Sequence, residues 1–138
     1  MSPSPSTSIR TIALVGHGAA GKTSHAESLL AATGTIASRG TVEKGNTTCD
    51  FDPLEKEFGH SLQTALVSCV WGGAQLHVID TPGYPDFAGQ AIAALAGVDT
   101  ALVVMNAQTG IELSTERLFN LAGERGLCRM LVVNKIDA

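Results

Sequence analysis

Residues 16–23 read GHGAAGKT, a glycine-rich segment that ends in a lysine and a threonine and fits the pattern GxxxxGK(S/T). Glycines let the backbone curl so that successive N–H groups point at phosphate oxygens, and the N-terminus of a following helix adds partial positive charge. We expect Lys22 to reach the β- and γ-phosphates of a nucleotide and the Thr23 hydroxyl to ligate Mg²⁺. The His17 side chain either touches phosphate or, in the interpretation we prefer, points away from it. The predicted nucleotide-binding residues here are Gly16, His17, Gly18, Ala19, Ala20, Gly21, Lys22, Thr23 and Ser24.

A second motif, Asp80-Thr81-Pro82-Gly83, follows the strand-like run AQLHVID. A carboxylate at the end of that strand is expected to lie beside the phosphate loop and to hold Mg²⁺ through a water, which is the role predicted for Asp80. The N–H of Gly83 is expected to contact the γ-phosphate and so to sense its presence. A proline–glycine turn alone is common, so the position of this motif after a strand is what supports a nucleotide site.

A third motif, Asn134-Lys135-Ile136-Asp137, follows the apolar run CRMLVV. The Asp137 carboxylate can accept hydrogen bonds from N1–H and the 2-amino group of guanine, whereas adenine offers no matching donors. Lys135 can lay its aliphatic stem along the base, and Asn134 can tie this loop to the phosphate loop. Together the three motifs predict a site for GTP or GDP with Mg²⁺ rather than for an adenine nucleotide.

The elements that must position these motifs alternate between strands and helices. Apolar runs at 10–15, 101–105 and 129–133 are typical of parallel strands covered on both faces. Helices are predicted at 22–34, 88–97 and 111–126, the last with Leu113, Leu118 and Leu121 toward the core. Gly72-Gly73 indicates a β-hairpin, and residues 35–61 are predicted to be a long irregular loop. The pattern is that of an α/β P-loop NTPase fold: a doubly wound, mostly parallel sheet with one antiparallel hairpin strand.

Composition and charge exclude several functional classes. The 138 residues suffice for one domain with a single core. Nine Lys plus Arg against thirteen Asp plus Glu give a net charge of −4, which argues against direct DNA binding. No apolar run approaches the ~18 residues that a membrane-spanning helix needs, so no membrane association is expected. The three cysteines show no CxxC spacing, and the absence of an export signal favours the cytoplasm.

From about residue 9 to residue 137 the chain resembles the GTPase domain of translation factors, most of all elongation factor G and its paralogues. The resemblance rests on DTPGYPDF, where the family typically has DTPGHVDF, on ALVVMNAQTGIELSTERLF and on NKID. The segment TVEKGNTTCDFDPLEKEFGHSL resembles the family's first switch loop. The resemblance implies GTP binding, a conformational cycle, and hydrolysis stimulated by the ribosome, which is expected as a partner of the full-length factor.

The family domain continues beyond NKxD with another guanine-contacting loop, a further strand and a final helix. Residues 1–8 are rich in serine and proline and are expected to form a disordered leader. Residues 9–138 are then expected to be a partial GTP-binding domain that lacks the C-terminal strand and helix. Its last strand is expected to lie at an exposed edge of the sheet.

The chain departs from the family pattern at residues near the phosphates. Ala19 stands where the family usually has an acidic residue, which puts monovalent-cation binding in doubt. The family's Mg²⁺-ligating threonine corresponds to Ser61, to which we carry the metal role. His60 and Gly18 replace two apolar gate residues. Tyr84 stands where the family has a water-positioning histidine; a neutral phenol can orient a water by hydrogen bonding, or the ring can simply pack on the neighbouring helix.

These departures predict a GTPase with a low intrinsic rate, in which Lys22, Gly83 and Tyr84 are the catalytic candidates and Thr23, Ser61 and Asp80 hold the metal. The predicted function is GTP hydrolysis coupled to ribosome movement. The alternative is a regulatory paralogue that binds guanine nucleotides with weak or no hydrolysis. An ATP-dependent kinase or ATPase on the same phosphate loop is disfavoured by NKID.

Overall fold

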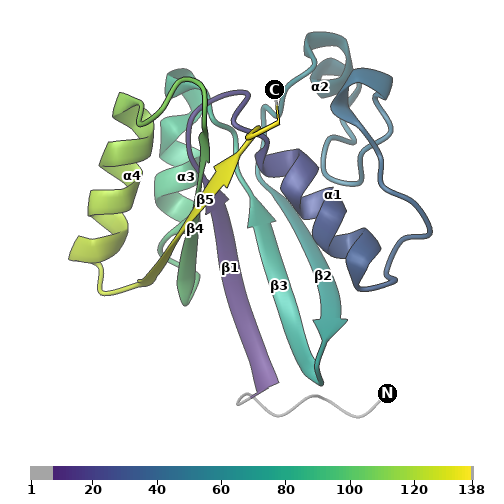
Figure 1. The fold of residues 1–138 in the computed structure, drawn as a ribbon, viewed down its shortest axis with the longest axis horizontal. Coiled ribbons are helices and arrows are strands. Elements are labelled where there is room, and N and C mark those ends of the chain that lie inside the picture. Colours follow the sequence, from purple (N-terminus) through teal and green to yellow (C-terminus); the bar gives the residue numbers. More distant parts are fainter. Residues whose placement is uncertain (1–7, 138) are drawn as a thin grey trace.

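A five-stranded sheet forms the middle layer of the protein in the computed structural model, which describes residues 8–137 (Figure 1). The strand order is β2-β3-β1-β4-β5, and every neighbouring pair is parallel except the antiparallel pair β2 and β3. This confirms the predicted doubly wound α/β sheet with one hairpin strand. Residues 1–7 of the predicted leader lie outside the described residues. The strands are β1 (Ile9–Val15), β2 (Ala65–Trp71), β3 (Ala74–Asp80), β4 (Thr100–Asn106) and β5 (Cys128–Asn134).

The helices that cover the sheet are α1 (Lys22–Ala32), α3 (Ala88–Ala94) and α4 (Leu113–Glu124). α1 lies on one face, and α3 and α4 lie on the other (Figure 1). Because side chains alternate along a strand, Val15 of β1 packs with α3 and α4 while Leu14 packs on the α1 side. β1 and β4 therefore bury both faces, which is why their sequences are continuous apolar runs.

β5 does not fit the expectation that its apolar run is covered on both faces. Among the described residues its strand partner is β4, so it lies at the sheet edge as predicted. Met130, Leu131 and Val133 are 57%, 47% and 49% exposed. An apolar run predicts a strand, but it does not distinguish a central strand from an edge strand, because covering depends on neighbours far away in the sequence.

The helix bounds correct two further expectations. Leu113 is the first residue of α4 and is 82% exposed, so it does not face the core, whereas Leu118 is buried and Leu121 packs partly against it. α3 ends at Ala94, three residues before the predicted end at Gly97. Within residues 8–137, no helix is both long and apolar enough to cross a membrane.

The hairpin at Gly72-Gly73 is present as predicted. The two glycines have φ values of +56° and +82° between β2 and β3. Two successive residues with positive φ are what a tight hairpin of this kind requires, and glycine adopts them without steric cost. The turn sets the register that pairs Ala65 with Asp80 at the other end of the hairpin, next to the phosphate loop.

The segment predicted as an irregular loop at 35–61 contains two short helices, η2 (Val42–Lys44) and α2 (Pro53–Phe58). α2 begins with a capping box: the Asp52 side chain accepts from the Leu54 N–H, and Glu55 accepts from the Asp52 N–H. Six residues are too few for a helical periodicity to show, although the Asp-x-x-Glu spacing was a readable signal.

Two buried glutamates hold this segment in place. Glu27 of α1 accepts from the backbone N–H groups of Gly40 and Thr48, and Glu55 accepts from those of Leu62 and Gln63 at 2.9 and 3.0 Å. Both carboxylates are almost fully buried. They satisfy backbone donors of a segment that has little regular structure, and so fix the path that leads to Ser61.

We expect Glu55→Gln to lower the free energy of unfolding by about 1–3 kcal/mol, because the NH2 of the glutamine side chain cannot accept as a carboxylate oxygen does and leaves at least one part-buried backbone N–H unpaired. Glu57→Gln, two residues later on the exposed side of α2, is the matched control and should leave the stability almost unchanged. Urea unfolding of the two variants measures the difference. Equal losses would show that Glu55 does not anchor the segment.

Candidate functional site

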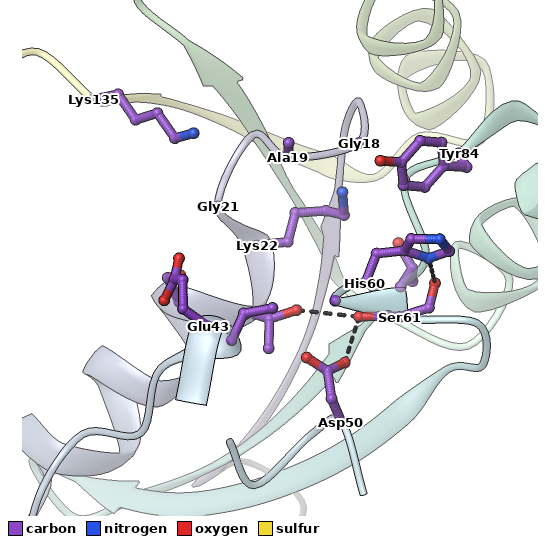
Figure 2. Close-up of a pocket in the computed structure, with 16 residues that line it drawn as sticks. Gly18, Ala19, Gly21, Lys22, Glu43, Asp50, His60, Ser61, Tyr84 and Lys135 are labelled. Atoms are coloured by element: carbon purple, nitrogen blue, oxygen red, sulfur yellow. Dashed lines mark hydrogen bonds between the residues drawn. The ribbon is translucent and has the colours of Figure 1, made fainter. Parts of the chain in front are cut away.

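The predicted motifs meet in one pocket beside the phosphate loop that connects β1 and α1 (Figure 2). The loop, the end of β3, the segment after α2 and the loop after β5 each contribute to its wall. The lining residues predicted from the sequence are Gly18, Ala19, Gly21, Lys22, Thr23, Ser24, Ser61, Thr81, Gly83, Tyr84 and Lys135. The predicted residues that do not line the wall are Gly16, His17, Ala20, Asp80, Pro82, Asn134 and Asp137. The residues that line it without having been predicted as site residues include Val42, Glu43, Asp50 and Gly59.

The phosphate loop depends on glycine at two positions. Gly16 has φ +139°, and a Cβ there would lie 2.2 Å from the Val104 carbonyl oxygen. Gly21 has φ +100°, and a Cβ there would lie 2.2 Å from Asn134 Nδ2. That amide donates to the Ala20 carbonyl oxygen at 3.0 Å, which is the predicted tie between the NKID segment and the phosphate loop.

Lys22 is buried and directed into the pocket. Its ammonium donates to the carbonyl oxygens of Gly16 and His17 at 3.1 and 2.8 Å. Burial lowers the pKa of Lys22 to about 8, and the Asp80 charge only partly offsets that effect. A buried ammonium held by two carbonyl oxygens is poised to bind more strongly charged oxygens, such as those of a phosphate.

Gly83 lies against this ammonium. A Cβ at residue 83 would lie 2.2 Å from Lys22 Nζ and 2.6 Å from the His17 carbonyl oxygen, so glycine is required there. Thr81 and Pro82 anchor the same turn: both are buried, and the Thr81 hydroxyl donates to the Leu14 carbonyl oxygen at 2.7 Å. The turn thus holds the Gly83 backbone next to the end of the Lys22 side chain.

A chain of oxygen atoms crosses the floor of the pocket (Figure 2). The Thr23 hydroxyl donates to Asp80 Oδ2 at 2.7 Å and lies 3.2 Å from the Ser61 hydroxyl, which in turn donates to Asp50 Oδ1 at 2.6 Å. The three predicted metal residues are therefore neighbours, joined by one carboxylate that the sequence analysis missed. Its readable signal was Thr47, which exchanges hydrogen bonds with Asp50 across a Thr-x-x-Asp turn.

This set of residues fits Mg²⁺. The donors are all oxygen, as Mg²⁺ prefers, and Mg²⁺ is typically held by one or two carboxylates together with phosphate and water. Asp80 Oδ1 is buried with no hydrogen-bond partner among the described residues. Burial raises the pKa of Asp80 to about 6, against the opposing effects of the Thr23 hydrogen bond and the Lys22 charge, while Asp50 raises it further. A cation would relieve this cost.

We expect Asp80→Asn to stabilise the nucleotide-free protein at pH 7. The folded-state pKa of about 6 lies above the ordinary value of 3.8, so the folded state binds more protons between these values and stability falls as pH rises through them. The substitution should therefore raise the free energy of unfolding by on the order of 1–3 kcal/mol at pH 7 and by little at pH 4. Urea unfolding at both pH values measures this, with the exposed Asp86→Asn as control. An advantage of equal size at both pH values would contradict the ionisation argument.

Tyr84 and His60 form another wall of the pocket (Figure 2). Their ring centroids are 4.5 Å apart, and Tyr84 is 39% exposed. Tyr84 also lies against the phosphate loop: a Cβ at Gly18 would be 3.2 Å from Tyr84 Cζ. Tyr84 thus lies next to both Gly18 and His60, two other positions that depart from the family pattern, and glycine at position 18 provides the room that the tyrosine ring takes up.

In the NKID segment, Lys135 reaches the pocket wall with φ +58°, while Asp137 is exposed. The His17 ring points away from the pocket, as the preferred interpretation had it. Its Nδ1 lies 3.0 Å from Glu112 Oε2 and 3.0 Å from Ser114 Oγ at the start of α4. The His17 contribution to the pocket is therefore its backbone, whose carbonyl oxygen holds Lys22.

Comparison with known proteins decides the family. A family model described as the elongation factor Tu GTP binding domain matches residues 7–138. The chain belongs to this family. Like other such GTP-binding domains, it is an α/β domain of the translational GTPase class, and the resemblance to elongation factor G stated above is confirmed.

Two curated relatives and one solved structure show how far the likeness extends. This GTP-binding domain is 39% identical to elongation factor G 2 of Streptomyces coelicolor over 99% of the chain and 20% of that protein. It is 37% identical to mitochondrial ribosome-releasing factor 2 of Yarrowia lipolytica over 94% of the chain and 16% of that protein. A solved protein of Thermus thermophilus is 43% identical, with a TM-score of 0.89 over 94% of the chain and 20% of that protein. The chain spans about a fifth of the length of these relatives.

Proposed function

We propose that the chain binds GTP or GDP with Mg²⁺ and hydrolyses GTP, as the nucleotide-binding part of an elongation factor G-like translation factor. The observation that carries the proposal is the hydrogen bond from Asn134 to the Ala20 carbonyl oxygen. It joins the NKID segment to the phosphate loop, so that base-reading and phosphate-binding groups belong to one site. In this proposal the nucleotide is bound by the residues that the sequence predicts in the glycine-rich loop at 16–24, in the turn at 80–83 and at Asn134, Lys135 and Asp137.

In this site Lys22 exchanges its two carbonyl partners for β- and γ-phosphate oxygens, and the N–H of Gly83 donates to the γ-phosphate beside it. Thr23 and Ser61 would supply hydroxyl oxygens to the metal, and the Asp80 carboxylate would hold it through a water. Mg²⁺ bound by these residues would supply positive charge that neutralises the phosphate oxygens. Because phosphoryl transfer depends mainly on positioning and charge neutralisation, these groups support hydrolysis without a covalent intermediate.

We infer further that the intrinsic rate is low and that the ribosome raises it through the full-length factor, which couples hydrolysis to ribosome movement. The low rate is expected because Tyr84 stands where the family has a water-positioning histidine and its ring packs beside Gly18 and His60. The curated relatives include proteins named for elongation and for ribosome release, both of which are ribosome-linked. We propose that the protein acts in the cytoplasm and binds neither membranes nor DNA.

The alternative is a regulatory paralogue that holds guanine nucleotides with weak or no hydrolysis. The observation that favours it is the same tyrosine, because its ring packs beside Gly18 and His60 and need not take part in catalysis. Release of labelled phosphate from GTP, with and without ribosomes, separates the two. We expect slow release by the protein alone and faster release with ribosomes. Tight GTP binding with no release above buffer in either case would establish the alternative.

A further inference from the structure

Two polar side chains line the pocket near the place proposed for the γ-phosphate, and they come from different segments. His60 follows α2, and Tyr84 follows the turn that holds Gly83. The two rings lie side by side along one wall (Figure 2), and Phe58 stacks beyond His60 with ring centroids 6.0 Å apart. Both His60 and Tyr84 are candidates to orient the attacking water, because each carries a polar atom at the end of its ring.

The Tyr84 ring packs against the phosphate loop at Gly18. A Cβ at Gly18 would lie within 3.2–3.4 Å of three atoms on one side of its ring, which includes Cζ, the carbon that bears the hydroxyl. The hydroxyl end points toward the phosphate loop in Figure 2. The ring therefore lies next to the loop at Gly18 and next to the imidazole of His60.

The hydrogen bond made by His60 Nδ1 leaves Nε2 of the same ring able to accept a hydrogen bond. Its Nδ1 lies 3.3 Å from the Ser61 carbonyl oxygen, and a carbonyl can only accept, so Nδ1 must carry the hydrogen. In the neutral ring Nε2 then has a free lone pair, since the two nitrogens of a neutral imidazole have opposite roles. Among residues 8–137 no hydrogen bond to Nε2 is present. The backbone of the next residue, whose side chain belongs to the proposed metal site, thus fixes the tautomer.

We propose that His60 orients the attacking water and that Tyr84 is a positioning residue that holds the imidazole in place. This inference rests on the proposed GTPase function. His60 Nε2 accepts a hydrogen bond from the water, so that the water oxygen faces the γ-phosphorus. The water oxygen forms the new bond to phosphorus, the electron pair of the broken P–O bond stays on the β-phosphate of GDP, and the water protons leave with the released phosphate and solvent.

The test is single-turnover GTP cleavage by matched variants, with GTP affinity measured separately. His60→Phe keeps an aromatic ring beside Tyr84 but removes the acceptor nitrogen, and Tyr84→Phe keeps the ring but removes the hydroxyl. We expect His60→Phe to slow cleavage by about tenfold or more, as loss of a water-orienting group should. Tyr84→Phe should stay within about threefold of the parent, while Tyr84→Ala should fall as far as His60→Phe because the wall is lost. His77→Gln, a histidine bonded to Ser68 on the hairpin, is the control.

A change in cleavage rate without a change in GTP affinity distinguishes an orienting role from a structural one. If Tyr84→Phe is as slow as His60→Phe, or if His60→Phe cleaves at the parental rate, the inference is overturned while the GTPase function stands. If the parent protein binds GTP and cleaves none, the proposed hydrolytic function and the inference fail together. If the cleavage rate that Tyr84→Ala loses is retained in Tyr84→Phe, the result supports the positioning role of the ring.

Discussion

Replacing Lys22 with methionine is expected to lower the affinity for GTP and GDP by about a hundredfold or more, because an ammonium hydrogen-bonded to several phosphate oxygens is lost. Methionine has similar length and no charge, so it fills much of the same space. In the nucleotide-free protein the ammonium is buried and binds only two backbone carbonyl oxygens. Its removal should therefore change the stability far less than the affinity. Calorimetric titration with GDP and Mg²⁺ measures the effect.

The matched control is Lys56→Met, which removes an exposed ammonium from α2. This variant should bind GDP like the parent. A Lys22→Met protein that unfolds at the same urea concentration as the parent and still binds GDP with parental affinity would remove Lys22 from the phosphate site. A protein that loses both stability and affinity would show that Lys22 is mainly a structural residue.

The same lysine predicts how binding depends on pH. Its pKa in the nucleotide-free protein is about 8, below the ordinary value of 10.5, because burial disfavours the charged form. Phosphate binding favours the ammonium, so binding above pH 8 must take up a proton and the affinity should fall as pH rises, by at most about tenfold per pH unit. Lys22→Met should lack this decrease. If the affinity of the parent protein for GDP stays constant between pH 7 and 9.5, nucleotide binding does not depend on protonation of Lys22 and the prediction is wrong.

Asp137→Asn is expected to exchange one base preference for another. The carboxylate offers two acceptors, which match N1–H and the 2-amino group of guanine. An asparagine amide offers one acceptor and one donor, which match the N1–H and the 2-carbonyl group of xanthine. Because a polar group left unpaired in such a contact is costly, GDP affinity should fall by about a hundredfold while XDP affinity rises by a comparable factor.

Competition of GDP and XDP against a fluorescent GDP analogue, for the parent and for Asp137→Asn, measures this exchange. Asp137 is exposed, so the substitution should leave unfolding by urea unchanged. A variant that weakens GDP and fails to gain XDP would show that Asp137 supports the loop without reading the base. A parental GDP affinity in the variant would remove Asp137 from the site altogether.

Local patterns predicted the parts of the fold that short-range chemistry determines. The phosphate loop follows from glycines at positions where a Cβ would collide with Val104 or Asn134, and the hairpin follows from two glycines with positive φ. The edge position of β5 was predicted from the family resemblance, whereas its apolar run alone suggested covering on both faces, because such a run says nothing of what lies on either side. The two short helices at 42–44 and 53–58 were missed because three and six residues are too few for a repeating helical pattern of apolar residues to show.

Some residues of the candidate site could likewise be predicted from local patterns, and others could not. Residues within the three motifs could be placed beside one another because parallel strands end at the same edge of a sheet. Asp50 and Glu55 could not, because their partners Ser61, Leu62 and Gln63 lie across an irregular segment whose path depends on buried hydrogen bonds. The contact between His60 and Tyr84 joins two loops and was likewise invisible to any local pattern.

The most direct test of a guanine-nucleotide site is competition against a fluorescent GDP analogue bound to this chain in the presence of Mg²⁺. The arrangement of Lys22, Asn134 and Asp137 predicts that unlabelled GTP and GDP displace the analogue, while ATP fails to do so even at about a hundredfold higher concentration. Displacement by ATP at the same concentration as GTP would contradict the account, because the NKID segment would then play no part in reading the base.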